Sequence, residues 1–191
     1  MTDMTKPSAT GAYDHEGRRK YLSRTEGSQF VQHATNLPKT HALFCLTIYY
    51  TGCRISEALA LRGQDIDLET KTILIRSLKK RGKHEIRRLS VPAFLVTGLL
   101  GVSPHERGKV VWPFSRTTGW RVIKGVMRRA QISGIHATTK GLRHGFGVRG
   151  AMMKIPPNII QQWMGHADPS TTAIYLAVKD EEERELIEKT W

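Results

Sequence analysis

The sequence is poor in cysteine and contains no long apolar run. The longest nearly apolar stretch, residues 42–50, is about half of the roughly 20 residues that a membrane-spanning helix needs. The first ten residues, MTDMTKPSAT, lack the apolar core of a secretory signal peptide. The two cysteines, Cys45 and Cys53, are not spaced as a zinc site, and without a secretion signal they indicate reduced core thiols. We therefore expect a cytoplasmic protein that does not contact membranes.

Acidic residues are also scarce. The chain has 17 Asp and Glu against 30 Lys and Arg, which gives a formal net charge of +13. Such an excess on a small protein favours a polyanionic partner, with DNA or RNA first. An acidic membrane surface is a weaker candidate, because no long basic amphipathic helix stands out. A highly soluble basic protein with no nucleic-acid partner is the alternative.

The length and the remaining composition are those of one globular domain. The 191 residues are 39% hydrophobic and 25% charged, with 17 glycines and 8 prolines, which excludes whole-chain disorder. Residues 1–20 are polar and without apolar periodicity, so we expect a flexible tail there. The domain is expected over residues 21–178, followed by an acidic helix or tail over residues 179–191.

Hydrophobic periodicity predicts a mainly α protein with one small antiparallel β-sheet, an α+β fold. Ser23 and Glu26 form a capping-box pattern at the start of the first helix. Helices are expected over residues 24–35, 40–50, 54–62, 93–100, 116–131, 139–150 and 157–164, and from residue 169 onward. Strands are expected over residues 71–78 and 84–91, with a short third strand over residues 65–67.

Four segments carry residues that could do chemistry. The segment 51–57 places Arg54 at a helix start and Glu57 three residues later, which also fits an ordinary helix corner with a surface ion pair. Residues 79–83, KKRGK, form a basic hairpin tip that could reach a DNA groove or donate a proton, or could simply be a solvated sheet edge.

The other two segments lie near the C-terminus. Lys140 and Arg143 are three residues apart near a helix start, where side chains and backbone N–H groups could hold a phosphate, although one more basic helix would look the same. His166 precedes Tyr175 by nine positions, across a helix start marked by Asp168 and Pro169. A tyrosine in such a helix is more often a core aromatic.

Taken in order, these segments resemble the tyrosine recombinase (phage integrase) family. TGCRISEALALRGQDID is similar to the first arginine box of that family. GLRHGFGVRGAMMKIPPNIIQQWMGHADPSTTAIY is similar to the second box, including its glycine–histidine turn and its terminal tyrosine. The resemblance covers about residues 22–178 and implies the fold of a tyrosine recombinase catalytic domain.

The resemblance implies a role for each matching residue. The implied catalytic residues are Arg54, Lys79, Lys140, Arg143, His166 and Tyr175. Supporting roles fall to Glu57 and Lys80. The DNA contacts expected are Lys80, Arg81, Lys83, Arg116, Arg121 and His144. The implied reaction is a metal-free and ATP-free strand exchange in which the tyrosine becomes a 3′-phosphotyrosine.

One position departs from the family pattern. Lys140 stands where the family usually has a histidine, three residues before the second arginine. A lysine can hold a phosphate oxygen, but a lysine side chain ordinarily keeps its proton at neutral pH and is a poor general base. We therefore predict that Lys140 is a phosphate ligand and not the general base.

The expected partners are double-stranded DNA and further copies of the chain. We expect the chain to form dimers or tetramers on DNA and to need no cofactor or metal. We also expect it to be associated with the nucleoid and to be encoded by a bacterium, phage or plasmid. Family members commonly carry an N-terminal DNA-clamping domain, so this sequence is expected to be either a shortened catalytic domain or a naturally short member like the fimbrial invertases. The acidic end is expected to dock on a neighbouring protomer through Leu186, Ile187 and Trp191. The rival interpretations are a type IB topoisomerase-like enzyme and a catalytically weak DNA-binding regulator.

Overall fold

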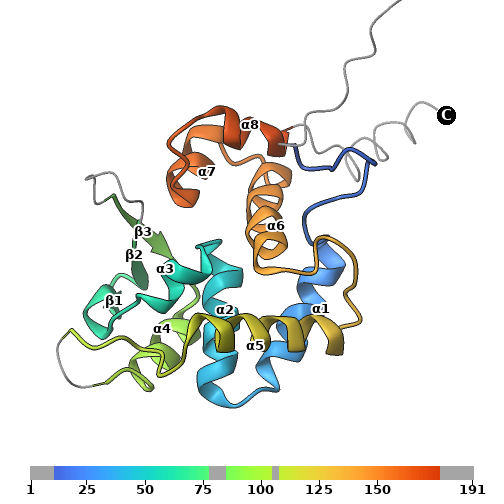
Figure 1. Ribbon diagram of the computed structural model, residues 1–191. Coiled ribbons are helices and arrows are strands. Elements are labelled where there is room, and N and C mark those ends of the chain that lie inside the picture. Colours follow the sequence, from blue (N-terminus) through green and yellow to red (C-terminus); the bar gives the residue numbers. More distant parts are fainter. Residues whose placement is uncertain (1–10, 78–84, 105–107, 177–191) are drawn as a thin grey trace, which may run out of the picture.

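The computed structural model describes residues 11–77, 85–104 and 108–176. In this part of the chain, helices surround one central helix and a small sheet lies at one side (Figure 1). This confirms the predicted mainly α architecture with a small antiparallel sheet. The elements are α1 (Arg24–Thr35), α2 (Lys39–Thr51), α3 (Ile55–Leu59), η1 (Gly63–Asp65), β1 (Ile66–Asp67), β2 (Thr72–Arg76), β3 (Ile86–Ser90), α4 (Ala93–Leu100), α5 (Arg116–Arg129), α6 (Thr139–Met152), α7 (Pro157–Met164) and α8 (Ser170–Leu176).

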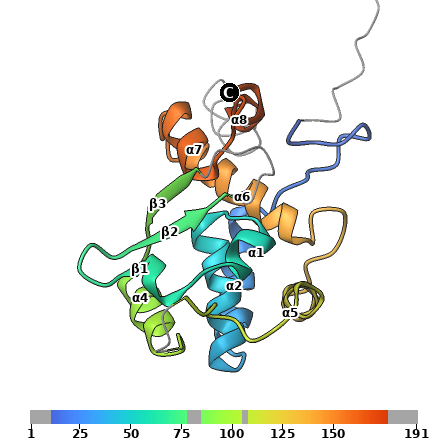
Figure 2. The same ribbon diagram turned by 60° about the vertical axis from the view of Figure 1, so that its left-hand side comes forward.

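Helix α2 forms the centre of the main hydrophobic core. Phe44, Cys45 and Ile48 are completely buried, because α1, α4, α5 and α6 pack around the helix (Figure 2). The helix ends at Gly52, whose φ of 60° lies in the left-handed region that glycine adopts without strain. The sequence prediction of a buried helix, of two buried free thiols and of a glycine stop is confirmed.

The sheet has the order β1-β2-β3 and is antiparallel throughout. Ile73 of β2 pairs with Leu89 of β3, and both are buried. Burial alternates along β3, so that Arg87 and Leu89 face inward while their neighbours face solvent. An arginine therefore occupies a core-facing position. The predicted hairpin tip between these strands lies outside the described residues.

Two stretches differ from the prediction. The helix expected over residues 54–62 ends at Leu59, because Leu61 is buried and its carbonyl accepts a hydrogen bond from Val111 N at 2.8 Å. The second half of the expected N-terminal tail, residues 11–20, lies against the protein. Within it, Ala12 is buried and Tyr13 forms a β-bridge with Arg19.

A second, smaller core cluster lies between α6, α7, α8 and the N-terminal segment (Figure 1). Its buried members are Ala12, Tyr21, Val148, Ile160, Met164 and Tyr175. Helix α7 ends at Gly165 with a φ of 61°, and the chain then turns back into α8. The helix start predicted at Asp168 is confirmed, because its Oδ1 accepts a hydrogen bond from Ser170 N at 2.9 Å.

In the part of the chain that the structure describes, no helix is long and apolar enough to cross a membrane. The acidic segment over residues 179–191, for which a docking role was predicted, lies outside the described residues.

Candidate active site

Tyr175 is seated in the second core cluster. Its ring is only 1% exposed and lies against α6. A Cβ atom at Gly147 would come within 2.5 Å of Cε2 of this ring, so the helix can approach the tyrosine only because that position is glycine. The glycine at position 147 therefore makes room on α6 for the aromatic ring of Tyr175.

The hydroxyl of Tyr175 is hydrogen bonded to a histidine that directly follows Arg143 in the chain. Nδ1 of His144 lies 3.0 Å from Oη of Tyr175. Burial, together with the nearby positive charges of Lys20, Lys140 and Arg143, lowers the pKa of His144 to about 4. The imidazole is therefore neutral at pH 7, and its Nδ1 can accept the phenolic hydrogen.

The same surroundings affect the tyrosine. Burial raises the pKa of Tyr175 to about 12, while the positive charges of Arg143 and Arg54 act in the opposite direction. Both guanidinium groups are therefore close enough to favour the phenolate. Their effect is smaller than that of burial in the protein without DNA.

His166 also contacts the tyrosine ring. The two rings are stacked, with centroids 6.1 Å apart and an angle of 26° between their planes. Nδ1 of His166 lies 2.9 Å from Oγ1 of Thr172, and the imidazole is 8% exposed. Because Thr172 belongs to α8, the histidine is fixed to the helix that carries the tyrosine.

Arg143 is buried and anchored at both terminal nitrogens. Nη1 donates to the carbonyl of Gly52 at 2.7 Å, and Nη2 donates to the carbonyl of Met164 at 2.6 Å. Burial lowers its pKa to about 10, with a further contribution from Arg54, while Glu57 opposes the shift. The guanidinium therefore ties the ends of α2 and α7 to α6.

Arg54 is the more open of the two arginines. Its side chain is 36% exposed, and Nη1 donates to Oε1 of Glu57 at 2.8 Å. The backbone N–H of Arg54 donates to the other carboxylate oxygen at 3.0 Å, so Glu57 also caps the first turn of α3. Glu57 is 2% exposed. Its ion pair with Arg54 is therefore buried on the carboxylate side and is not the ordinary surface ion pair that the sequence also allowed.

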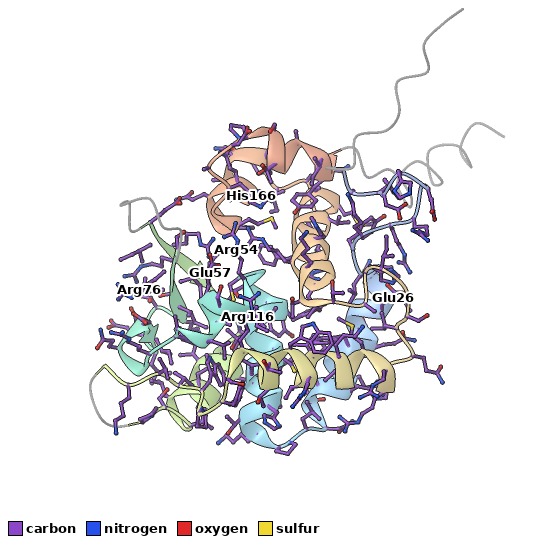
Figure 3. All side chains as sticks on the ribbon, viewed as in Figure 1. Glu26, Arg54, Glu57, Arg76, Arg116 and His166 are labelled. Atoms are coloured by element: carbon purple, nitrogen blue, oxygen red, sulfur yellow. The ribbon has the colours of Figure 1, made fainter. Side chains whose placement is uncertain are left out.

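A further arginine completes this charge network, and sequence reasoning missed it. Nη2 of Arg87 donates to Oε2 of Glu57 at 2.6 Å, and Nη1 donates to the carbonyl of Met164 at 2.6 Å. Figure 3 shows Glu57, Arg54 and His166 in succession between α3 and the α7–α8 turn. The alternation of apolar and polar residues in the second predicted strand was the available signal, since it places Arg87 on the same face as Leu89.

Lys140 lies in a different environment. It is exposed and lines an open cavity of about 760 Å³ at the start of α6, together with Lys20, Thr138, His144 and Asp168. The side chain of Thr138 caps the helix by accepting from Gly141 N at 3.1 Å. This cavity lies next to the tyrosine hydroxyl, because His144 contacts both.

The remaining predicted residues divide into two groups. The first group lies outside the described residues: Lys79, Lys80, Arg81 and Lys83. Arg116 and Arg121 are exposed on α5 (Figure 3 labels Arg116). His144, predicted as a DNA contact, is partly buried, lines the cavity and is bonded to the tyrosine, a contact that no signal in the sequence indicated. Among the described residues, no group of three or more His, Cys, Asp or Glu side chains is placed to hold a metal ion.

The site thus combines a buried tyrosine, three arginines and two histidines from segments between residues 54 and 175 of the chain. Comparison with known proteins identifies the class. The pattern that defines the Phage integrase family matches residues 20–182, and the chain belongs to this family of tyrosine recombinases. It has the fold of their catalytic domain.

Two curated relatives illustrate the range of similarity. Tyrosine recombinase XerA of Pyrococcus furiosus is 34% identical over 158 residues, which cover 77% of this chain and 53% of that protein. Type 1 fimbriae regulatory protein FimB of Escherichia coli is 30% identical over 84% of this chain and 85% of its own length. The chain spans 48–62% of the lengths of three Xer recombinases that it matches.

Solved structures agree with this assignment. The crystal structure of a XerA recombinase superposes with a TM-score of 0.73 at 26% identity, covering 89% of this chain and 64% of that one. The catalytic domain of bacteriophage HP1 integrase has the same fold, with a TM-score of 0.64 at 19% identity, covering 82% of this chain and 86% of that one.

Proposed function

We propose that this chain is a site-specific recombinase that cuts and rejoins double-stranded DNA through a 3′-phosphotyrosine intermediate. The observation that carries the proposal is the position of Tyr175, whose hydroxyl bonds to a neutral imidazole and whose ionisation is favoured by two arginines. Membership of the tyrosine recombinase family supports the same reaction. XerH, a site-specific recombinase whose crystal structure shows it bound to its difH substrate, has the same fold.

The chemistry requires positive charge that is already in place. Attack on the phosphodiester produces a pentavalent phosphate with extra negative charge on its non-bridging oxygens. Arg54 and Arg143 would neutralise this charge with planar, fixed donors, and Lys140 and His166 would add further ones. Removal of one such preorganised donor typically costs about 3–4 kcal/mol of transition-state stabilisation. The 5′-oxygen that leaves needs a proton, and we assign its donation to Lys79 of the hairpin.

A suicide-substrate assay tests this proposal. Because the target sequence is unknown, nicked duplexes with a randomised core are incubated with the protein, and SDS-resistant protein–DNA complexes are captured and sequenced. The wild type is expected to become covalently attached to one family of sites. Tyr175→Phe, which lacks the nucleophile, should give no adduct, whereas Tyr50→Phe, which removes a hydroxyl on α2, should react like the wild type. Absence of any adduct with the wild type would refute the proposal.

Recovered sites also allow the reaction to be distinguished from that of a type IB topoisomerase-like enzyme. A recombinase joins strands from two site-bearing duplexes, whereas a topoisomerase relaxes a supercoiled plasmid without exchanging partners. A two-site recombination assay beside a plasmid relaxation assay separates the two. We favour recombination because the curated relatives reported above include XerA recombinases.

Self-association on DNA forms part of the proposal. The acidic segment over residues 179–191 carries three apolar side chains, Leu186, Ile187 and Trp191, and we assign to it the contact with a neighbouring protomer. Deletion of residues 180–191 should then reduce recombination more than cleavage of a single site. Equal loss in both assays would contradict this assignment.

A further inference from the structure

Lys140 occupies the position at which the family usually has a histidine, but a different residue of α6 is hydrogen bonded to the hydroxyl of Tyr175. Lys140 is exposed at the mouth of the cavity. The side chain on the hydroxyl is His144, with Nδ1 3.0 Å from Oη. The two α6 residues are four positions apart, so they share one face of the helix and line the same cavity.

We propose that His144 is the proton acceptor for Tyr175 in strand cleavage and that Lys140 holds the phosphate beside it. This inference rests on the proposed function. In the step, the proton on Oη moves to Nδ1 of His144 as the Oη–phosphorus bond forms, and the bond from phosphorus to the 5′-oxygen breaks. That oxygen leaves as a hydroxyl after taking a proton from the hairpin lysine. In the rejoining step, a 5′-hydroxyl attacks the phosphorus and gives its proton to the hairpin lysine, while the Oη–phosphorus bond breaks and His144 returns its proton to Oη.

The surroundings of His144 explain how an acceptor can be kept ready. Burial and the positive charges of Lys20, Lys140 and Arg143 keep the imidazole neutral, and its Nδ1 lies within hydrogen-bond distance of the phenolic oxygen. Lys20 comes from the N-terminal segment, and Lys140 and Arg143 come from α6. Asp168 lines the same cavity, and His166 stacks on the tyrosine ring.

Binding of a phosphodiester would raise the pKa of His144. An anion held by Lys140 and Arg143 offsets two of the charges that oppose protonation of His144. The proton affinity of the imidazole therefore rises when the substrate arrives, and the proton transfer is coupled to occupation of the site. Helix α6 thus supplies the phosphate ligand at 140, the acceptor at 144 and the ring seat at Gly147, all along one face.

The substitution His144→Asn separates hydrogen bonding from proton transfer. The amide oxygen of asparagine occupies nearly the position of Nδ1 and can accept the hydrogen bond, but it cannot take the proton. Single-turnover cleavage of the recovered nicked site should become about 10²–10⁴-fold slower. His33→Asn, on α1, is the matched control and should cleave at the wild-type rate.

The pH profile distinguishes an acceptor from a merely structural residue. With a neutral acceptor in place, wild-type cleavage should vary little between about pH 6 and pH 9. In His144→Asn the tyrosine must ionise on its own, so the rate should rise nearly tenfold per pH unit over this range. A 5′-bridging phosphorothiolate substrate, whose leaving group needs no acid, should not restore His144→Asn, because the lost function is on the tyrosine side.

Each outcome bears on the inference. A His144→Asn rate equal to that of the wild type, or a reduced rate with an unchanged pH profile, would overturn the assignment while leaving the proposed function intact. Restoration by the phosphorothiolate would also overturn it, because His144 would then serve the leaving group. His144→Gln provides a second variant in case His144→Asn does not fold. A wild type that forms no adduct would overturn both the function and the inference.

Discussion

Removal of Arg87, a buried arginine on β3, is expected to destabilise the fold strongly. Its side chain is 2% exposed and holds both the carboxylate of Glu57 and the carbonyl of Met164. Arg87→Met keeps a long apolar stem on β3 but removes one of the two cations paired with Glu57 and one of the two arginine donors to the carbonyl of Met164, where Arg143 remains. Removal of one partner of a buried ion pair generally costs about 3–5 kcal/mol.

The structure places the expected value at the low end of that range. Glu57 retains two hydrogen bonds, from Nη1 and from the backbone N–H of Arg54. Within the described residues, the buried Nε of Arg87 has no hydrogen-bond partner, so its removal also relieves a desolvated donor. We expect a loss of about 3 kcal/mol in the free energy of unfolding, which for a domain of this size corresponds to roughly 6–12 °C in the melting temperature.

Urea titration followed by far-UV circular dichroism measures this loss, and the neighbouring arginine provides a control. Arg88 is on the solvent face of β3, with a side chain that is 57% exposed and 3.4 Å from Asp67. Arg88→Met should change the free energy of unfolding by no more than about 0.5 kcal/mol. A loss below about 1 kcal/mol for Arg87→Met, or equal losses for the two variants, would refute the reasoning.

The same contrast should depend on pH. Burial alone would raise the pKa of Glu57, but its ion pair with Arg87 and its hydrogen bonds outweigh burial and lower the pKa below the ordinary value of 4.5. A lowered carboxyl pKa stabilises the fold above the ordinary value, and this contribution is lost as the pH falls through the lowered one. The stability difference between the wild type and Arg87→Met should therefore shrink below about pH 4.5. A difference that grows in acid would contradict this sign.

Three further predictions concern packing, thiols and salt. Gly147→Ala should destabilise the fold by about 1–3 kcal/mol and reduce cleavage, because the added Cβ overlaps the ring of Tyr175; Gly125→Ala on α5, with no atom within 4 Å of the added carbon, should be neutral or slightly stabilising in the same denaturation assay. Ellman's reagent at pH 8 should label neither thiol of the folded protein, because burial raises the pKa of Cys45 to about 12 and that of Cys53 to about 11; rapid labelling without denaturant would contradict this. DNA affinity should fall steeply between 50 and 200 mM salt in a fluorescence-anisotropy titration, since the binding is driven by phosphate contacts, and a flat response would count against it.

Much of the fold could be predicted from the sequence because its local signals agree with its packing. The capping pattern at Ser23 starts α1, and the glycine at position 52 ends α2, each for a reason that acts within a few residues. The sheet was predictable from alternation, and the register Ile73↔Leu89 follows from burying the same face of both strands. The early end of α3 was not, because it depends on pairing between Leu61 and Val111, which are 50 positions apart.

The site was predicted unevenly for a similar reason. Arg54 and Glu57 are neighbours on one helical turn, so their contact is a local property. The contact between His144 and Tyr175 joins α6 to α8 over 31 positions and depends on how these helices pack. The ion pair between Arg87 and Glu57 is also non-local, because the two residues are 30 positions apart in the sequence. A basic residue in a strand is usually exposed to water, so its type alone did not predict this pairing.

The anchoring of Arg143 has a consequence for how this position can vary. A guanidinium has five N–H groups, and two of them are occupied by the carbonyls of Gly52 and Met164, which leaves three directed by the plane of the group. The protein has thus fixed the orientation of the fork before any anion arrives, and little rotational freedom remains to be lost on binding. A lysine would preserve the charge but has a single nitrogen, which cannot span both carbonyls and still face a ligand. Equal charge at this position therefore does not mean equal capability.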